Sequence, residues 1–353
     1  MRPHLTPSPP FLAAALAAAL LAAALPAAAQ QPQFEERVEV LRVVLETRVV
    51  NSHDEPVTGL GISDFSVTVG GQPVPLEAAA WVGTSYDREA VAEALLAGRE
   101  LPAVTPRPGR LYVLLYQLGW DRTRMVGHVR MGQNIGTFLD TLGPDDKVAV
   151  ASFGSQLRLL LDFTSDREAI DDAVKVTSIL KEVGRPHRTG SPSLAATLDW
   201  RAAEDAATPE AALLVVGRAL LPISGPKTLL WIGWGLGTLH QMGMTVEAND
   251  YAAALQALAR AHTTVFSLDI TDADYHSLED GLKQVADDTG GTYAKTHLFP
   301  DIALEMLERT LAGHYELVFP VPEELPTGVY EIKVNLTKAR GRVLYNELLD
   351  VRR

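Results

Sequence analysis

The chain has 353 residues, with 31 basic and 44 acidic side chains, a formal net charge of −13 and no cysteine. Such an acidic surface repels phosphate backbones and anionic lipid, which excludes nucleic acid as an expected partner. The lack of cysteine excludes disulfide bonds and thiolate metal sites, so packing must supply the stability.

The first 29 residues have the pattern of a secretory signal peptide. Arg2 precedes an apolar run at residues 11–25, and the alanines at 27–29 offer a small-residue cleavage site before Gln30. The run has about 15 residues, fewer than the roughly 20 that span a bilayer as a helix. We therefore expect an exported protein, periplasmic or secreted, whose mature part has no membrane span.

Alternating apolar residues predict strands in the next segment, residues 30–83. Residues 38–50 and 64–69 both alternate with period two, and the glycine pair that follows the second run predicts a tight hairpin turn. A third strand contains two prolines, extends to about residue 82 and is expected at a sheet edge. Residues 84–109 are rich in proline and are expected to form a linker with a short helix at 87–97.

From residue 110 to 313 the chain alternates strands and helices. Residues 110–116 form a nearly continuous apolar run, which is typical of a strand buried on both faces. Further strands are predicted at 147–153, 157–163, 227–232 and 263–269 and after 291. Helices are predicted at 123–142, 166–181 with Ser165 as cap, between 194 and 220, and at 246–261, 277–289 and 300–312. This alternation indicates an α/β fold with a doubly wound, mostly parallel sheet.

The C-terminal segment, residues 314–353, returns to strands. They are predicted at 314–319, 328–336 and 342–351, separated by turns that contain proline or glycine. Neither end of the chain has enough strands for a core of its own. We therefore predict that the two ends pair into one small β-sandwich, with the α/β domain inserted between them.

The order of these elements resembles the von Willebrand factor A domain. The resemblance includes residues 265–269, which form one of the late strands, and residues 289–293, which lead into the last strand of the α/β region. Residues 55–65, the hairpin after them and residues 315–320 are similar to exported von Willebrand factor A-related proteins of Acidobacteria. The resemblance covers nearly all of the chain after the first 29 residues and implies a Rossmann-type sheet with its site at the carboxyl ends of the strands.

The resemblance also implies a site for one Mg²⁺ or Mn²⁺. Family members hold the ion through an Asp-x-Ser-x-Ser loop, a Thr and a second Asp, and leave one position open for a partner's carboxylate. Here Tyr116 stands at the first Asp, and Leu118 and Trp120 stand at the two serines. Trp234, or Gly233 if the register slips by one, replaces the second Asp. Hard divalent ions need oxygen ligands, so we expect a degenerate site without a metal or other cofactor.

We therefore predict a non-enzymatic module that binds a partner protein through these loops. Aromatic side chains at the end of a sheet suit a protein interface, although they could also just fill the space that an ion would take. Ser191 or Ser193 stands in for the family's Thr. The predicted partner-binding residues are Tyr116, Leu118, Trp120, Asp121, Ser191, Ser193, Trp234 and Gly235.

Two alternatives remain open. In the first, Asp121 with Ser191 or Ser193 retains a Mg²⁺ or Mn²⁺ ion, and the chain is a metal-dependent adhesion domain. In the second, Asp269, Asp272 and Asp274 cluster at the end of a strand and serve a hydrolase, although a solvated loop with helix-capping aspartates explains them as well.

Overall fold

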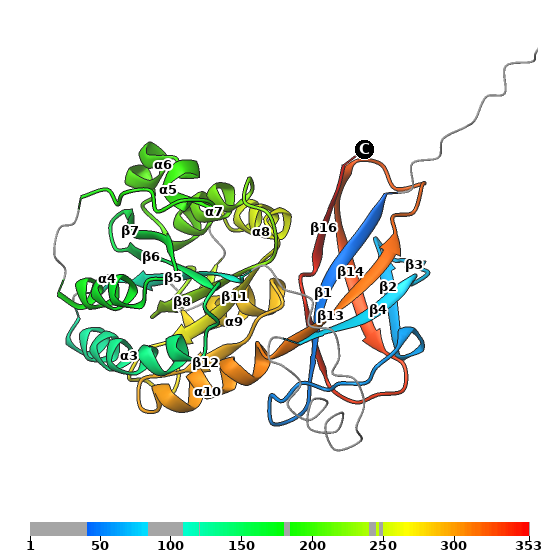
Figure 1. Ribbon diagram of the computed structural model, residues 1–353, viewed down its shortest axis with the longest axis horizontal. Helices are drawn as coiled ribbons and strands as arrows, with labels where there is room; N and C mark the ends of the chain where they lie inside the picture. Colours follow the sequence, from blue (N-terminus) through cyan, green and yellow to red (C-terminus); the bar gives the residue numbers. More distant parts are fainter. Residues whose placement is uncertain are drawn as a thin grey trace, which may run out of the picture. The chain divides into compact units, whose positions relative to one another are not determined.

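The computed structural model describes residues 41–83, 109–119, 121–179, 184–239, 245–246 and 250–352 (Figure 1). All of these residues belong to one unit of the chain, residues 40–353. The predicted signal peptide, the helix expected at 87–97 and Trp120 lie outside them. Among the described helices, none combines the length and the apolar character that crossing a membrane requires.

A six-stranded sheet forms the centre of the α/β part, in the order β12-β11-β8-β5-β6-β7. All neighbours are parallel except β6 and β7, which the three-residue turn Gly154-Ser155-Gln156 joins as an antiparallel hairpin, since so short a link cannot make a crossover. Every residue of β5 is buried, as its continuous apolar run predicts. The strands are β5 (Leu111–Gln117), β6 (Lys147–Phe153), β7 (Leu157–Thr164), β8 (Lys227–Gly233), β11 (Thr263–Asp269) and β12 (Tyr293–Lys295).

Helices cover both faces of this sheet. One apolar core includes Tyr112 of β5 and side chains of α3, α4 and α10, and the other includes Val113 of β5 and side chains of α5 to α9. The predicted doubly wound α/β fold is thus confirmed. The helices are α3 (Arg122–Asp140), α4 (Arg167–Ile179), α5 (Leu194–Thr197), α6 (Trp200–Asp205), α7 (Pro209–Leu220), α8 (Tyr251–Arg260), α9 (Glu279–Asp288) and α10 (Pro300–Thr310).

Strands from both ends of the chain build a β-sandwich, as predicted. Its two antiparallel sheets have the orders β15-β1-β13-β4 and β16-β14-β2-β3, and their apolar side chains share one core. The glycine pair between β2 and β3 has φ angles of 57° and 80°, which the predicted hairpin turn requires. The strands are β1 (Arg42–Val50), β2 (Phe65–Val69), β3 (Gln72–Val74), β4 (Ala78–Gly83), β13 (Gly313–Pro320), β14 (Gly328–Leu336), β15 (Arg342–Tyr345) and β16 (Leu348–Val351).

Three local predictions were wrong. The strand expected at 342–351 is two strands, β15 and β16, because the chain passes from one sheet to the other between them. The third N-terminal strand is likewise divided between the two sheets, as β3 and β4. The cap of α4 is Asp166 rather than Ser165, since the Asp166 carboxylate accepts the amide hydrogens of Glu168 and Ala169.

The carboxyl ends of the parallel strands meet along one side of the sheet. Gly233 of β8 lies beside Asp269 of β11, and Gln117 of β5 lies beside Phe153 of β6. We call this side the carboxyl edge. The opposite side, where β6 starts at Lys147, is the amino edge.

Candidate functional site

Gln117 joins two loops at the carboxyl edge. Its side chain is buried, and its Oε1 accepts the amide hydrogens of Trp234 at 2.9 Å and Gly235 at 3.0 Å. Its backbone carbonyl lies 2.8 Å from Nε2 of His128 on α3. Gly235 is needed for close packing, because a Cβ there would lie 2.5 Å from Cβ of Leu278. The loops after β5, β8 and β11 are therefore held together.

A pocket of about 260 Å³ opens among these loops. Its walls come from the start of α3, from the loop after β8 and from the loop between β11 and α9. The lining residues are Asp121, Thr123, Arg124, Trp234, Thr271, Asp272, Ala273, His276, Ser277 and Leu278.

Arg124 and Trp234 form a stacked pair in this pocket. The guanidinium carbon of Arg124 lies 3.6 Å from the centre of the indole ring. The indole Nε1 donates to the carbonyl of Leu118 at 3.3 Å, which fixes the ring against the loop after β5. Such stacking orients a guanidinium without using its N–H donors. Within the described part of the chain, no carboxylate or carbonyl accepts a hydrogen bond from Arg124.

Asp121 begins α3 as its N-cap. Its carboxylate accepts the amide hydrogen of Thr123 at 2.8 Å and the hydroxyl hydrogen of the same residue at 2.6 Å. These two bonds hold the pKa of the exposed Asp121 below its usual value. The carboxylate is thus already engaged in capping the helix.

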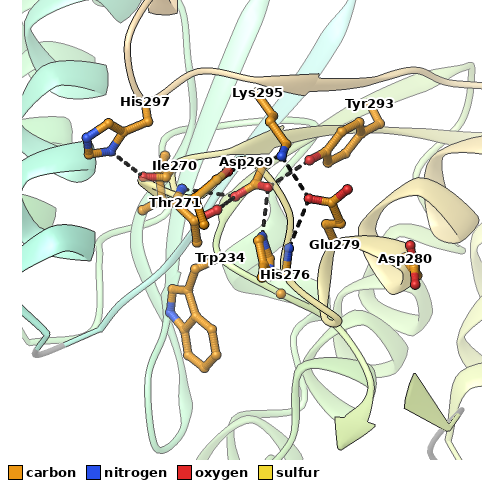
Figure 2. Close-up of polar contacts among 12 residues, drawn as sticks. Trp234, Asp269, Ile270, Thr271, His276, Glu279, Asp280, Tyr293, Lys295 and His297 are labelled. Atoms are coloured by element: carbon orange, nitrogen blue, oxygen red, sulfur yellow. Dashed lines mark hydrogen bonds and ion pairs between the residues drawn. The ribbon is translucent and has the colours of Figure 1, made fainter. Parts of the chain in front are cut away.

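A polar network lies beneath the pocket, around Asp269 at the end of β11 (Figure 2). The Asp269 side chain is fully buried, and its Oδ1 accepts two hydrogen bonds from Thr271, at 2.9 Å from the amide and 2.6 Å from the hydroxyl. Its Oδ2 lies 2.9 Å from Nε2 of His276 and 2.7 Å from the hydroxyl of Tyr293. Four hydrogen bonds therefore offset the burial of this charge.

Glu279, the first residue of α9, is the second buried carboxylate of the network. Its oxygens pair with Nζ of Lys283 at 2.6 Å and Nζ of Lys295 at 2.9 Å. Burial opposes ionisation of Glu279, but the bonds from the two lysines outweigh it and lower the pKa of its carboxyl group. Burial and the bond to Asp269 raise the pKa of Tyr293, so this phenol keeps its proton.

Asp269, His276 and Glu279 are the residues that could hold a metal ion in the described part of the chain. One ligand atom of each lies within 4.8 Å of the others, and two carboxylates with an imidazole suit a transition-metal ion. However, the Lys295 ammonium already pairs with Glu279, and Asp269 already accepts four hydrogen bonds. The network is complete without an ion.

The structure separates the predicted partner-binding residues into three groups. Asp121 and Trp234 line the pocket, and Leu118 lies half-buried beside them. Tyr116 and Gly235 are buried, so the expectation of an exposed aromatic at 116 was wrong. Tyr116 points into the core beneath α3, and burial raises the pKa of its phenol.

Ser191 and Ser193 form the third group, and they lie at the amino edge. The carbonyl of Ser191 accepts a hydrogen bond from Lys147 at the start of β6, at 2.9 Å. The hydroxyl of Ser193 donates to the buried carboxylate of Asp162 at 2.6 Å. Neither serine reaches Asp121 at the opposite edge, so the proposed metal ligand set does not come together.

The aspartates of the hydrolase alternative also have separate environments. Asp269 is buried in the network, Asp272 pairs with His297 at 3.3 Å, and Asp274 is exposed. The partners of Asp269 and the role of Arg124 were not predicted from the sequence. A signal existed only for His276 and Glu279, which follow the strand end by seven and ten positions.

Exposed apolar side chains gather near the same edge. Of the eleven large apolar side chains that are exposed in the described residues, six lie at the starts of α3 and α10, with exposures of 38 to 65%. The two helices pack against each other, and Arg130 of α3 donates to the carbonyl of His297, just before α10, at 2.8 Å. The six residues, which we call the apolar patch, are Met125, Val126, Val129, Leu298, Phe299 and Ile302.

Comparisons with known proteins reveal similarity only at the level of structure, since no protein-family model and no curated protein matches the chain. The chain is similar to the human COPII-coat protein Sec24c, at 10% identity and a TM-score of 0.42, over 69% of this chain and 44% of that one. It is similar to a von Willebrand factor type A protein from Catenulispora acidiphila, at 11% identity and a TM-score of 0.40, over 86% and 74% of the two chains. It is also similar to BatB from Bacteroides thetaiotaomicron, at 14% identity and a TM-score of 0.35, over 57% and 98%.

The chain thus spans less than half of the Sec24c chain. Similarity at these identities and TM-scores carries no conclusion on function, so the function must be argued from the site itself.

Proposed function

We propose that the chain is an exported, non-enzymatic protein-interaction module of the von Willebrand factor A type. It binds a partner protein at the carboxyl edge and needs no metal ion to do so. The observation that carries the proposal is the apolar patch, three of whose side chains lie on α3, the helix whose first turn lines the pocket.

The apolar patch supports a binding role because the fold does not require it. Its side chains remain 38 to 65% exposed, so they add little to the core beneath α3 and α10. Single exposed apolar residues are common, but a contiguous group bordered by polar residues is typical of an interaction site. Here the polar border is the pocket, whose lining includes Asp121, Thr123 and Arg124 in the turn that precedes Met125.

The pocket supports binding without a metal. Asp121 caps α3, and Trp234 occupies the position that the family resemblance gives to an acidic ligand. The Arg124 guanidinium stacks on that indole ring and supplies a fixed positive charge beside it. A second cation next to this guanidinium would meet direct repulsion.

The test compares two valines of similar exposure. Val129 lies in the apolar patch and is 44% exposed, whereas Val44 lies on β1 of the sandwich and is 50% exposed. We expect Val129→Glu to abolish capture of a specific protein from an envelope extract, and Val44→Glu to leave capture unchanged, both at unaltered thermal stability. Quantitative mass spectrometry of the captured proteins provides the readout. Equal capture by wild type and Val129→Glu would contradict the proposal.

A further inference from the structure

The first turn of α3 carries two arginines in an unfavourable place. Arg122 and Arg124 lie in this turn, which has no acidic residue. The helix dipole places partial positive charge at this end, so each cation here destabilises the helix. The chain as a whole has ample acidic residues, 44 against 31 basic ones. Helix stability therefore does not explain the choice of arginine here.

Within the pocket, the negative charges have hydrogen-bond or ion-pair partners, whereas the guanidinium has only the Coulomb attraction of Asp121 and no described hydrogen-bond acceptor. The carboxylate of Asp121 accepts two bonds from Thr123, and that of Asp272 pairs with His297 at 3.3 Å. Arg124 lacks an acceptor among the described residues, yet its stack on Trp234 holds it in one orientation. A planar guanidinium fixed in this way is suited to bind a carboxylate through two parallel hydrogen bonds.

We propose that Arg124 binds an acidic side chain of the partner protein, an Asp or Glu with apolar residues beside it in the partner's sequence. The apolar neighbours would lie on the apolar patch, which starts at Met125, the residue after Arg124. This inference rests on the proposed function, since it names the chemistry of the partner segment that the carboxyl edge receives.

The charge of the chain favours a protein over a membrane as the occupant. Basic residues beside an exposed apolar patch also suit an anionic lipid surface. However, the chain carries a formal net charge of −13, which repels such a surface as a whole. A short protein segment meets only the local charge of α3, where the three arginines Arg122, Arg124 and Arg130 stand against one acidic residue, the N-cap Asp121, before Asp140 is reached.

The experiment selects peptides on the full chain from a random phage-displayed library. The best peptide is synthesised with a fluorophore, and its Kd is measured by fluorescence anisotropy for wild type, Arg124→Gln and Arg124→Lys. Arg185→Gln is the matched control, because Arg185 also stacks on a tryptophan, Trp200, at 4.7 Å, but its guanidinium is paired with Glu204 at 3.0 Å.

We expect the selected peptides to contain an acidic residue next to apolar ones. Arg124→Gln should then weaken binding about 10-fold or more, as for other hydrogen bonds to charged groups. Arg124→Lys should bind with intermediate affinity, and Arg185→Gln should bind like wild type. A peptide whose acidic residue is changed to its amide should bind wild type as weakly as the unchanged peptide binds Arg124→Gln. Its affinity should not fall further when it is measured on Arg124→Gln.

Four results would overturn the inference: no selected peptide, selected peptides without an acidic residue, a Kd indifferent to Arg124→Gln, or equal losses for Arg124→Gln and Arg185→Gln. If peptides without acidic residues bind and Val129→Glu abolishes their binding, the proposed function survives and only the acidic partner is wrong. Vesicles of phosphatidylcholine with phosphatidylglycerol provide the remaining control. Binding to them that is lost in Arg124→Gln would replace the protein partner by a membrane.

Discussion

The two edges of the central sheet each contain a buried aspartate with similar surroundings. At the amino edge, Asp162 accepts bonds from the hydroxyl of Ser193 and from the amides of Leu194 and Ala195. At the carboxyl edge, Asp269 accepts four bonds, two of them from Thr271. Each of the two carboxylates is thus already engaged by the hydrogen bonds that it accepts. Buried polar groups at both edges therefore belong to the fold.

The edges differ in what lies outside these networks. At the carboxyl edge a pocket, a stacked guanidinium and the apolar patch lie together, and the exposed side chains of the patch add little to the core. The loops at the amino edge bond back to the strands, as Ser191 does to Lys147. Comparing the edges thus separates residues that hold the structure from residues that are left for binding.

The largest expected effect tests whether Asp269 is structural like Asp162. We expect Asp162→Ala and Asp269→Ala each to lower the free energy of unfolding by about 3 kcal/mol, because each leaves several buried donors without an acceptor. Asp274→Ala, at an exposed position, should change it by less than about 0.5 kcal/mol. Urea unfolding measures all three. A neutral or stabilising Asp269→Ala would indicate that this carboxylate serves a chemical function and not the stability of the fold. Asp269 would then differ from Asp162.

Much of the fold could be predicted from the sequence, because burial leaves a local pattern. The continuous apolar run of β5 indicated a strand covered on both faces, and the strands at the chain ends were too few for separate cores. No local sequence pattern indicated that Ser193 lies at the amino edge. Its position depends on β7 being antiparallel, which carries Asp162 back toward the amino edge, where it binds the serine.

The site was harder to predict, since its contacts join residues far apart in the sequence. Trp234 was predicted to lie at the site, but Arg124, which stacks on it, is more than 100 positions away and has no local signal. Tyr116 was expected to be partly exposed because the family resemblance puts it at the first Asp of the metal site. Its side chain instead points to the face that α3 covers, a consequence of strand alternation and helix placement together.

The second prediction concerns His128, which lies under the carboxyl edge. Burial lowers the pKa of His128 to about 4 in the folded chain, against about 6.5 when it is unfolded. Above pH 6.5 neither state is protonated, and the shift has no effect on stability. As the pH falls from 6.5 to about 4, only the unfolded chain binds the proton, so stability falls by up to about 1.4 kcal/mol per pH unit.

His128→Gln keeps a donor for the Gln117 carbonyl but cannot titrate. Urea unfolding between pH 4 and about 7 should therefore show a shallower loss of stability for this variant than for wild type. The same change at the exposed His53 serves as control and should preserve the wild-type slope. Equal slopes for wild type and His128→Gln would mean that the space beneath this edge admits water or a counter-ion.

A smaller effect is expected at the first turn of α3. Arg122→Glu should raise the free energy of unfolding by roughly 0.5 kcal/mol, because it replaces a cation by an anion at the positive end of the helix dipole. A gain in stability together with a loss of peptide binding would identify Arg122 as a residue that serves binding and lowers the stability of the fold. Thermal unfolding at low salt measures the change. A destabilised Arg122→Glu would show that this arginine supports the helix after all.

The smallest expected effect is that of metal ions. We expect millimolar Mg²⁺ or Mn²⁺, and a chelator, to move the Tm of the chain by less than about 1 °C, because a ligand raises Tm only if it binds the native state. Two variants at the carboxyl edge distinguish the possible origins of any shift. A shift lost in Asp121→Ala would assign the ion to the pocket and contradict metal-free binding. A shift lost in His276→Ala but kept in Asp121→Ala would place the ion in the Asp269 network, where it must displace the Lys295 ammonium from Glu279.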